Sequence, residues 1–85
     1  MSYRIIFSEL AEKRFYNLDK TVQEQMAKRL SKAADNPRMF VKGLTGIKHL
    51  SLRAGDYRAI VDIDESSKLI MVLDVGHRRE VYKKR

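Results

Sequence analysis

The last ten residues of the chain, 76–85, bring together side chains that suit chemistry on a phosphate. They carry five arginines and lysines, one imidazole at His77 and one phenol at Tyr82. A guanidinium group is a fixed fork of N–H donors that binds phosphate oxygens and stabilises negative charge developing on them. Histidine is the natural proton carrier because its unperturbed pKa is about 6.5. The segment therefore predicts a site that binds a phosphate and transfers protons.

A second basic segment, residues 37–61, adds to the charge of this tail. It contains five basic residues and one acidic residue, as does the tail, so each segment contributes +4 to a net charge of +7. The rest of the chain is close to balanced. Such an uneven distribution favours a polyanion as the partner. The alternative is a solvated basic surface that only increases solubility.

The first 36 residues predict one strand and two helices. Residues 3–7 are rich in β-branched and aromatic side chains, which suits a strand. Ser8 can cap a first helix, and a second helix begins at Asp19 or Thr21. That helix carries an apolar stripe, and Pro37 ends it because proline disfavours a helical residue before it. The stripe consists of Val22, Met26, Leu30 and Ala33.

The second half of the chain predicts strands. Residues 42–46 form a loop by their glycines, and residues 49–53 alternate between apolar and polar side chains. Residues 57–63 return after a tight turn. Residues 69–73 are nearly all apolar, which predicts a central strand covered on both faces. Strands joined by short turns pair antiparallel.

These elements predict an α+β fold in a single domain over residues 1–85. An N-terminal strand and a two-helix hairpin pack on one side of a twisted antiparallel sheet. The chain has no cysteine, which excludes disulfides and thiolate metal sites and fits the reducing cytoplasm. No apolar run is long enough to span a membrane. Without a zinc-ligand pattern, a phosphate-binding glycine loop or a nucleophile elbow, we expect a reaction with no metal and no cofactor.

The predicted sheet gathers the basic side chains on one face. His49, Ser51 and Arg53 alternate onto the same side, and Arg58 follows one turn later. Because neighbouring strands lie about 5 Å apart, these groups and the tail could line one concave surface. His49 is then a second candidate for proton transfer. Lys42 and Lys48, in or near loops, predict nonspecific attraction of phosphates.

Each of these residues also has a purely structural interpretation. Arg58 could be paired with Asp56 or Asp62, and His77 could be a polar residue that ends a strand. The rings of Tyr57 and Tyr82 could simply pack. Residues 83–85 could form a solvated tail.

Two segments resemble the RelE/ParE superfamily of toxins from bacterial and archaeal toxin–antitoxin systems. They are Leu52-Arg53-Ala54-Gly55-Asp56-Tyr57-Arg58 and Val75-Gly76-His77-Arg78-Arg79-Glu80-Val81-Tyr82, within a similarity that runs from residue 3 to residue 82. The first segment is shared across the superfamily, whereas the second is closer to the RelE branch. The resemblance implies a fold like that of small microbial ribonucleases and cleavage of messenger RNA in the ribosomal A site.

The resemblance also implies roles for individual residues. Arg58 matches an arginine that contacts the scissile phosphate. Arg78 matches an arginine that helps to stabilise charge on the phosphate or the leaving group. Tyr82 matches a tyrosine that stacks on or orients the substrate base. The chain departs from the RelE pattern at His49 and Ser51, which replace lysines with base or phosphate-binding roles. Ser51 does not supply that positive charge, and His49 does so only in part.

We therefore expect a ribosome-dependent, metal-independent endoribonuclease toxin. The ribose 2′-hydroxyl attacks the adjacent phosphate, with His49 as the preferred base and His77 as the second proton-transfer candidate. A small acidic antitoxin would cover the site, and operator DNA would be bound only through the antitoxin. The residues expected to hold RNA phosphates are Lys42, Lys48, Arg53, Arg79 and Lys83.

Two other functions remain open from the sequence. The ParE branch poisons DNA gyrase, and a ParE-like chain would use the basic tail for structure or for an interface. A basic RNA-binding module without catalysis would use the same charges only to attract phosphate.

Overall fold

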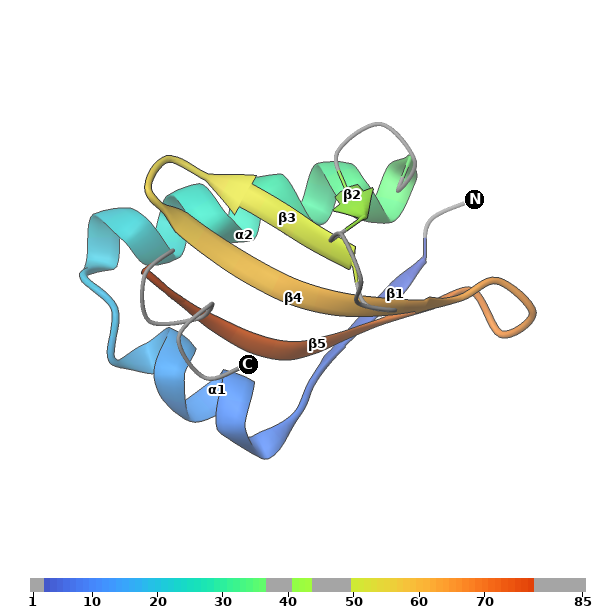
Figure 1. The fold of residues 1–85 in the computed structure, drawn as a ribbon, viewed down its shortest axis with the longest axis horizontal. Helices are drawn as coiled ribbons and strands as arrows, with labels where there is room; N and C mark the ends of the chain where they lie inside the picture. The colour runs from blue at the N-terminus through green and yellow to red at the C-terminus, as the bar shows by residue number, and fades with distance from the viewer. Residues whose placement is uncertain (1–2, 37–40, 44–49, 78–85) are drawn as a thin grey trace.

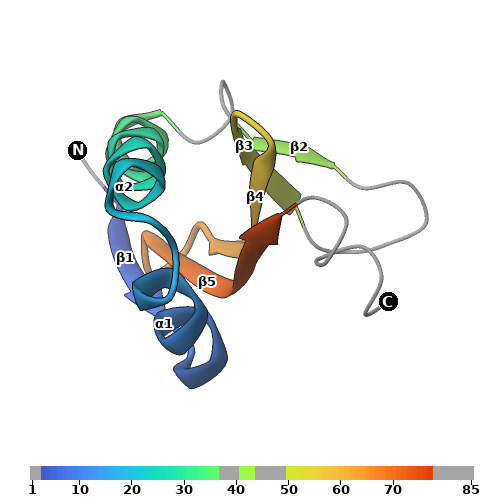
Figure 2. The ribbon, with the colours of Figure 1, turned by 90° about the vertical axis from the view of Figure 1, so that its left-hand side faces the viewer.

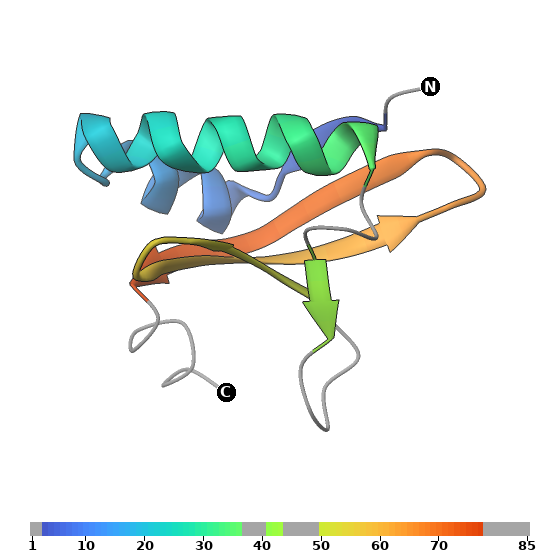
Figure 3. The same ribbon diagram turned by 90° about the horizontal axis from the view of Figure 1, so that it is seen from above.

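The structure is a computed structural model that describes residues 3–36, 41–43 and 50–77 (Figure 1). The predicted α+β fold is confirmed, and the element order is the predicted one with an additional strand at residues 41–43. The elements are β1 (Arg4–Phe7), α1 (Glu9–Tyr16), α2 (Lys20–Asp35), β2 (Val41–Gly43), β3 (Leu50–Ala54), β4 (Tyr57–Asp64) and β5 (Leu69–His77). Both helices lie on one face of the sheet, and the opposite face has no described helix over it (Figures 2 and 3).

The five strands form one sheet in the order β1-β5-β4-β3-β2. The strands β3, β4 and β5, which are joined by short turns, pair antiparallel as predicted. β1 instead runs parallel to β5, because the two helices and the rest of the sheet lie between these strands in the sequence. β2 pairs antiparallel with β3 where the glycines predicted only a loop. For residues 42 and 43 that prediction was wrong, because main-chain pairing with β3 outweighs the low strand propensity of this segment. Residues 44–46 lie outside the described residues.

β5 lies inside the sheet, as predicted, but only one of its faces is fully covered. Ile70 and Val72 are buried against the helices, whereas Leu69, Met71 and Leu73 are only half-buried. The expectation of a strand covered on both faces was therefore wrong, because both helices pack on the same side.

A β-bulge interrupts the pairing of β4 with β5. Val61 lies opposite Val72, and Ile60 lies opposite Asp74, so Leu73 has no partner in β4. An extra residue of this kind reverses the face on which the following side chains lie. Val72 and Val75 consequently both reach the core, although they are three residues apart.

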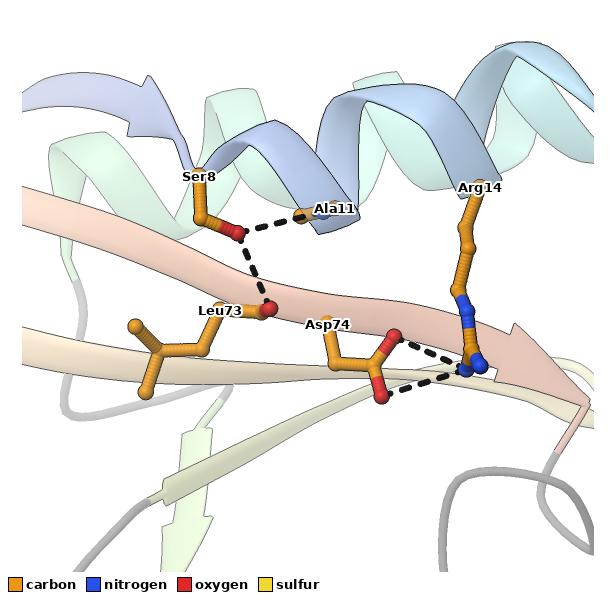
Figure 4. A network of polar contacts seen from close by, with 5 residues as sticks. All are labelled: Ser8, Ala11, Arg14, Leu73 and Asp74. Carbon is orange, nitrogen blue, oxygen red and sulfur yellow. Dashed lines mark hydrogen bonds and ion pairs between the residues drawn. The ribbon is translucent and has the colours of Figure 1, made fainter. Parts of the chain in front are cut away.

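Ser8 connects α1 to this bulge (Figure 4). Its hydroxyl accepts a hydrogen bond from the Ala11 amide at 3.1 Å, which caps the helix as predicted. The same hydroxyl donates to the Leu73 carbonyl at 3.0 Å, and the Ser8 amide donates to the Val72 carbonyl at 2.9 Å. One serine thus begins α1 and satisfies the main chain of the bulge.

The hydrophobic core lies between α2 and the sheet. The predicted stripe of α2 supplies Met26, Leu30 and Ala33, all buried. They belong to one cluster with buried residues of the strands, among them Leu52 and Val61. In the described ranges, neither helix is long and apolar enough to cross a membrane.

The turn between β4 and β5 leads to a prediction about pH. Hydrogen bonds from Ser67 and Ser66 lower the pKa of Asp64 from 3.8 to about 2. Because the folded-state pKa is the lower one, the carboxylate stabilises the turn above the unfolded-state pKa, and this contribution is lost as the pH falls through about 2. We expect an NMR titration of the Asp64 carboxyl to show a midpoint near that value. A midpoint unchanged in a variant with alanine at both serines would contradict the assignment.

Candidate functional site

The sheet face away from the helices carries two arginines side by side. Arg53 of β3 and Arg58 of β4 are direct cross-strand partners, so their side chains lie on the same face. Arg53 is exposed, and its Nε donates a hydrogen bond to the Gly55 carbonyl at 3.3 Å. Arg58 is half-buried, and its Nη1 atom is shielded from solvent. Like charges directly opposite one another destabilise a strand pair, so this arrangement suits an anion bound between them.

On its other side Arg58 lies opposite Gly76 of β5. Because Gly76 has no side chain, β5 contributes only main chain next to the guanidinium group. Without the bulge, Val75 would occupy this place and its isopropyl group would lie beside the arginine. The bulge therefore places β5 next to Arg58 at a residue that has no side chain to occupy the space beside the guanidinium group.

The next row of the same face is buried and forms the floor of the site. Ser51 lies opposite Ile60, and Ile60 lies opposite Asp74. All three are at least 92% buried, since their exposed fractions are 8%, 0% and 6%. The main chain of Lys42 is in register with Ser51, which continues the row into β2. The predicted alternation is confirmed: Ser51 and Arg53 share this face, whereas Leu52 is in the core.

The one carboxylate of this row is already bound to a cation (Figure 4). Nη1 of Arg14, at the end of α1, lies 3.1 Å and 3.2 Å from the two carboxylate oxygens of Asp74. The side chains of Arg14 and Asp74 are only 21% and 9% exposed. Arg14 thus neutralises the buried acid of this row and reduces its repulsion of an anionic ligand.

Sequence reasoning missed this ion pair, although a signal for it existed. Asp74 is a lone carboxylate within an otherwise apolar strand, and a buried charge needs a partner. The identity of the partner was not predictable, because Arg14 is 60 residues away in the sequence.

His77 lies on the opposite face from Arg58. It is the cross-strand partner of Tyr57, and the centroids of the two rings are 5.4 Å apart in an edge-to-face arrangement. Tyr57 packs against the core on the helix side. The structure therefore brings Arg53 and Arg58 together and places His77 apart from them, so a proton-transfer role for His77 stays a prediction.

Several predicted site residues lie outside the described ranges. These residues are Lys48, His49, Arg78, Arg79, Tyr82 and Lys83. For Lys42 only the main chain is described. In the described part of the chain, no group of three or more His, Asp or Glu side chains could hold a metal ion.

The chain is a small basic α+β protein that is suited to binding an anion. Two helices cover one face of its twisted five-stranded sheet, and the paired arginines lie on the other face. Residues 5–82 match the family of ParE toxins of type II toxin–antitoxin systems. A protein from Escherichia coli that carries the name of a RelE-like toxin is 38% identical over 81 residues, covering 92% of this chain and 85% of its own. The mRNA interferase toxin RelE of Escherichia coli is 32% identical over 87 residues, covering 96% and 92%.

Solved structures of such toxins have the same fold. A mutant of the Escherichia coli toxin RelE in the free state superimposes with a TM-score of 0.78 at 31% identity, covering 98% of this chain and 93% of that one. The RelBE2 toxin–antitoxin complex from Mycobacterium tuberculosis contains a chain with a TM-score of 0.83 at 22% identity, covering 92% and 93%. This chain belongs to the RelE/ParE superfamily of toxins from type II toxin–antitoxin systems and lies near its RelE branch.

Proposed function

We propose that this chain is an mRNA interferase, a toxin that stops translation by cutting messenger RNA. The observation that carries the proposal is the arginine pair of Arg53 and Arg58 beside Gly76, which has no side chain. Similarity to the mRNA interferase toxin RelE over nearly the full length of both chains supports the same activity. The toxin domain spans residues 1–85 and acts in the cytoplasm, where messages are translated.

The proposed reaction is a phosphoryl transfer within the message. The 2′-oxygen forms a bond to the adjacent phosphorus and the bond from phosphorus to the 5′-oxygen breaks, which leaves a 2′,3′-cyclic phosphate and a 5′-hydroxyl. A base takes the proton of the 2′-hydroxyl, and an acid gives a proton to the leaving 5′-oxygen. Arg58 stabilises the negative charge that grows on the non-bridging oxygens, so its interaction is strongest in the transition state.

The remaining roles in the proposal follow from the resemblance and from the sequence alternation. His49 is the preferred base, since it precedes β3 by one residue and alternates with Ser51 and Arg53. Arg78 assists charge on the phosphate or the leaving group. Tyr82 positions a base by stacking, a contact of about 1–3 kcal/mol.

A message held by the ribosome fits this site better than free RNA does. The arginine pair stabilises charge on a phosphate, and the site gains most from a substrate whose attacking and leaving oxygens are already aligned. The ribosomal A site orders the message and is therefore the proposed place of cleavage.

A cognate antitoxin is the proposed cellular partner. Escherichia coli RelE has been solved as an intact RelBE toxin–antitoxin complex, and a chain of that complex is 27% identical to this one with a TM-score of 0.75. An acidic antitoxin segment over Arg53 and Arg58 would relieve their mutual repulsion and block access of phosphate. Operator DNA would be bound only by the toxin–antitoxin complex, through the antitoxin.

A translation-coupled cleavage assay tests the proposal. We expect the purified chain to cut a translated message within codons, to leave untranslated message intact, and to retain its activity in EDTA. The expected termini are a cyclic phosphate and a 5′-hydroxyl, which 5′-end mapping with and without kinase treatment distinguishes. Binding of RNA without any cleavage would instead identify a non-catalytic RNA-binding module.

A gyrase inhibitor is the second candidate, because the family match to ParE toxins covers residues 5–82. In that case induction of the chain would produce gyrase-linked DNA breaks and leave translated messages uncut. The pairing of Arg53 with Arg58 on one sheet face favours RNA cleavage, since two adjacent guanidinium groups suit the binding of a phosphate.

A further inference from the structure

A second basic surface lies on the other side of the β3–β4 turn from the arginine pair. The exposed residues Lys28, Arg29 and Lys32 of α2 line a groove of about 350 Å³ together with Gln25, Ala54 and Gly55. The turn between β3 and β4 overlaps α2 in the view of Figure 1, and Gly55 of this turn lines the groove together with residues of α2. We call this surface the α2 groove.

The helical repeat explains why these cations gather there. Met26, Leu30 and Ala33 turn toward the sheet and fix the rotation of α2. Positions 25, 29 and 32 then follow one flank of this apolar stripe, and that flank lies next to β3. The basic residues are therefore held beside a strand by the packing of the core.

The turn itself connects the α2 groove to the candidate site. Gly55 has a φ of 63°, and a Cβ atom at this position would lie 3.8 Å from Oε1 of Gln25. The carbonyl of Gly55 also accepts the hydrogen bond from Nε of Arg53. One residue of the turn thus contacts the floor of the groove on one side and an arginine of the candidate site on the other. Arg58 lies directly beside that arginine, so the basic surface continues around the turn.

The cations of the groove are available to a ligand. Among the described residues, no hydrogen bond or ion pair involves the side chains of Lys28, Arg29 or Lys32. The nearest acidic residue of the turn, Asp56, is exposed. Side chains three or four residues apart on a helix have Cβ atoms about 5–6 Å apart, so Lys28 and Lys32 can reach successive phosphates of one strand.

We propose that the α2 groove binds the RNA phosphate backbone as a second, non-catalytic site. It would hold ribosomal RNA or a flanking part of the message while the arginine pair engages the scissile phosphate. The inference rests on the proposed function for its biological setting. Its physical content, phosphate binding by three named side chains, can be tested without any cleavage.

The test compares two triple variants that lose the same charge. Lys28→Gln, Arg29→Gln and Lys32→Gln are combined in one variant, which removes the cations of the α2 groove. Arg4→Gln, Lys13→Gln and Lys20→Gln, all exposed residues elsewhere, are combined in the other. Binding to vacant ribosomes, to message-programmed ribosomes and to a naked single-stranded RNA is measured between low and physiological salt.

We expect the groove variant to bind at least about tenfold more weakly at low salt. The slope of log affinity against log salt should become shallower by about 2, because each lost contact to a single strand removes about 0.7. The control variant should change affinity less than about threefold. Weaker binding to vacant ribosomes assigns the groove to ribosomal RNA, and weaker binding only where message or naked RNA is present assigns it to the message.

Two results would overturn the inference. One is an equal loss in the groove and control variants, which would reveal only a general charge effect. The other is unchanged RNA binding together with weaker binding of an acidic antitoxin peptide, which would assign the groove to a protein partner. If the unmodified chain shows groove-dependent RNA binding but never cuts, the proposed function fails and the inference stands. The single change Lys28→Gln provides the same comparison if a triple variant does not fold.

Discussion

Replacing Arg58 by alanine is expected to lower the rate of translation-coupled cleavage by about 10²–10³-fold, the effect of removing one preorganised donor to a developing oxyanion. Arg58 is the half-buried member of the arginine pair, and its Nη1 atom is shielded from water. Low exposure to water strengthens its interaction with a phosphate. The measurement is the single-turnover rate at saturating ribosomes, which separates chemistry from binding.

Three comparisons make the result specific to Arg58. Arg58→Lys keeps the charge but loses the planar fork, so it should recover only part of the rate. Arg53→Ala should act mainly on affinity, since Arg53 is exposed. Lys13→Ala, an exposed change on α1, should leave the rate unchanged. A fully active Arg58→Ala variant would show that the phosphate is held elsewhere.

Replacing Arg14 by alanine is expected to destabilise the fold by about 2–3 kcal/mol. The change leaves the Asp74 carboxylate buried without its cation, which costs about 3–5 kcal/mol in a fully buried pair. The smaller value applies because the Arg14 side chain is 21% exposed and water can partly replace it. Urea denaturation of an inactive background provides the measurement, with Lys13→Ala as a control that should stay within about 0.5 kcal/mol.

A double-mutant cycle separates the ion pair from other effects of the substitution. Arg14→Met combined with Asp74→Leu removes both charges and should recover much of the lost stability, as apolar replacements of buried pairs often do. Equal destabilisation by Arg14→Ala in the presence and absence of the Asp74 carboxylate would show that the pair is not the cause.

Local signals were sufficient to predict most of the fold. Ser8 caps α1, and the stripe from Met26 to Ala33 faces the core, because both depend on neighbouring residues along the helix. The parallel pairing of β1 with β5 was not predictable in the same way. It depends on which sheet edge remains free after the hairpins form, and no short sequence pattern encodes that choice.

The candidate site was predictable where a short turn determines it. Gly55 and Asp56 close the hairpin and so place Arg53 opposite Arg58. The position of His77 depends instead on the bulge at Leu73, which has no clear signature in an apolar strand. Simple alternation from Val72 would place His77 on the arginine face, and the extra residue turns it to the other side.

The same irregularity makes the pairing register of this strand a functional property. Up to Val72, the even-numbered side chains of β5 face the core. Beyond Leu73, the odd-numbered side chains lie on that face instead. Pairing of Leu73 with Ile60 in a regular ladder would turn Val75 toward Arg58 and direct the Asp74 carboxylate into the hydrophobic interior, with the composition unchanged. The geometry of the site therefore depends on the register of β5 against β4, in which Leu73 stays outside the ladder.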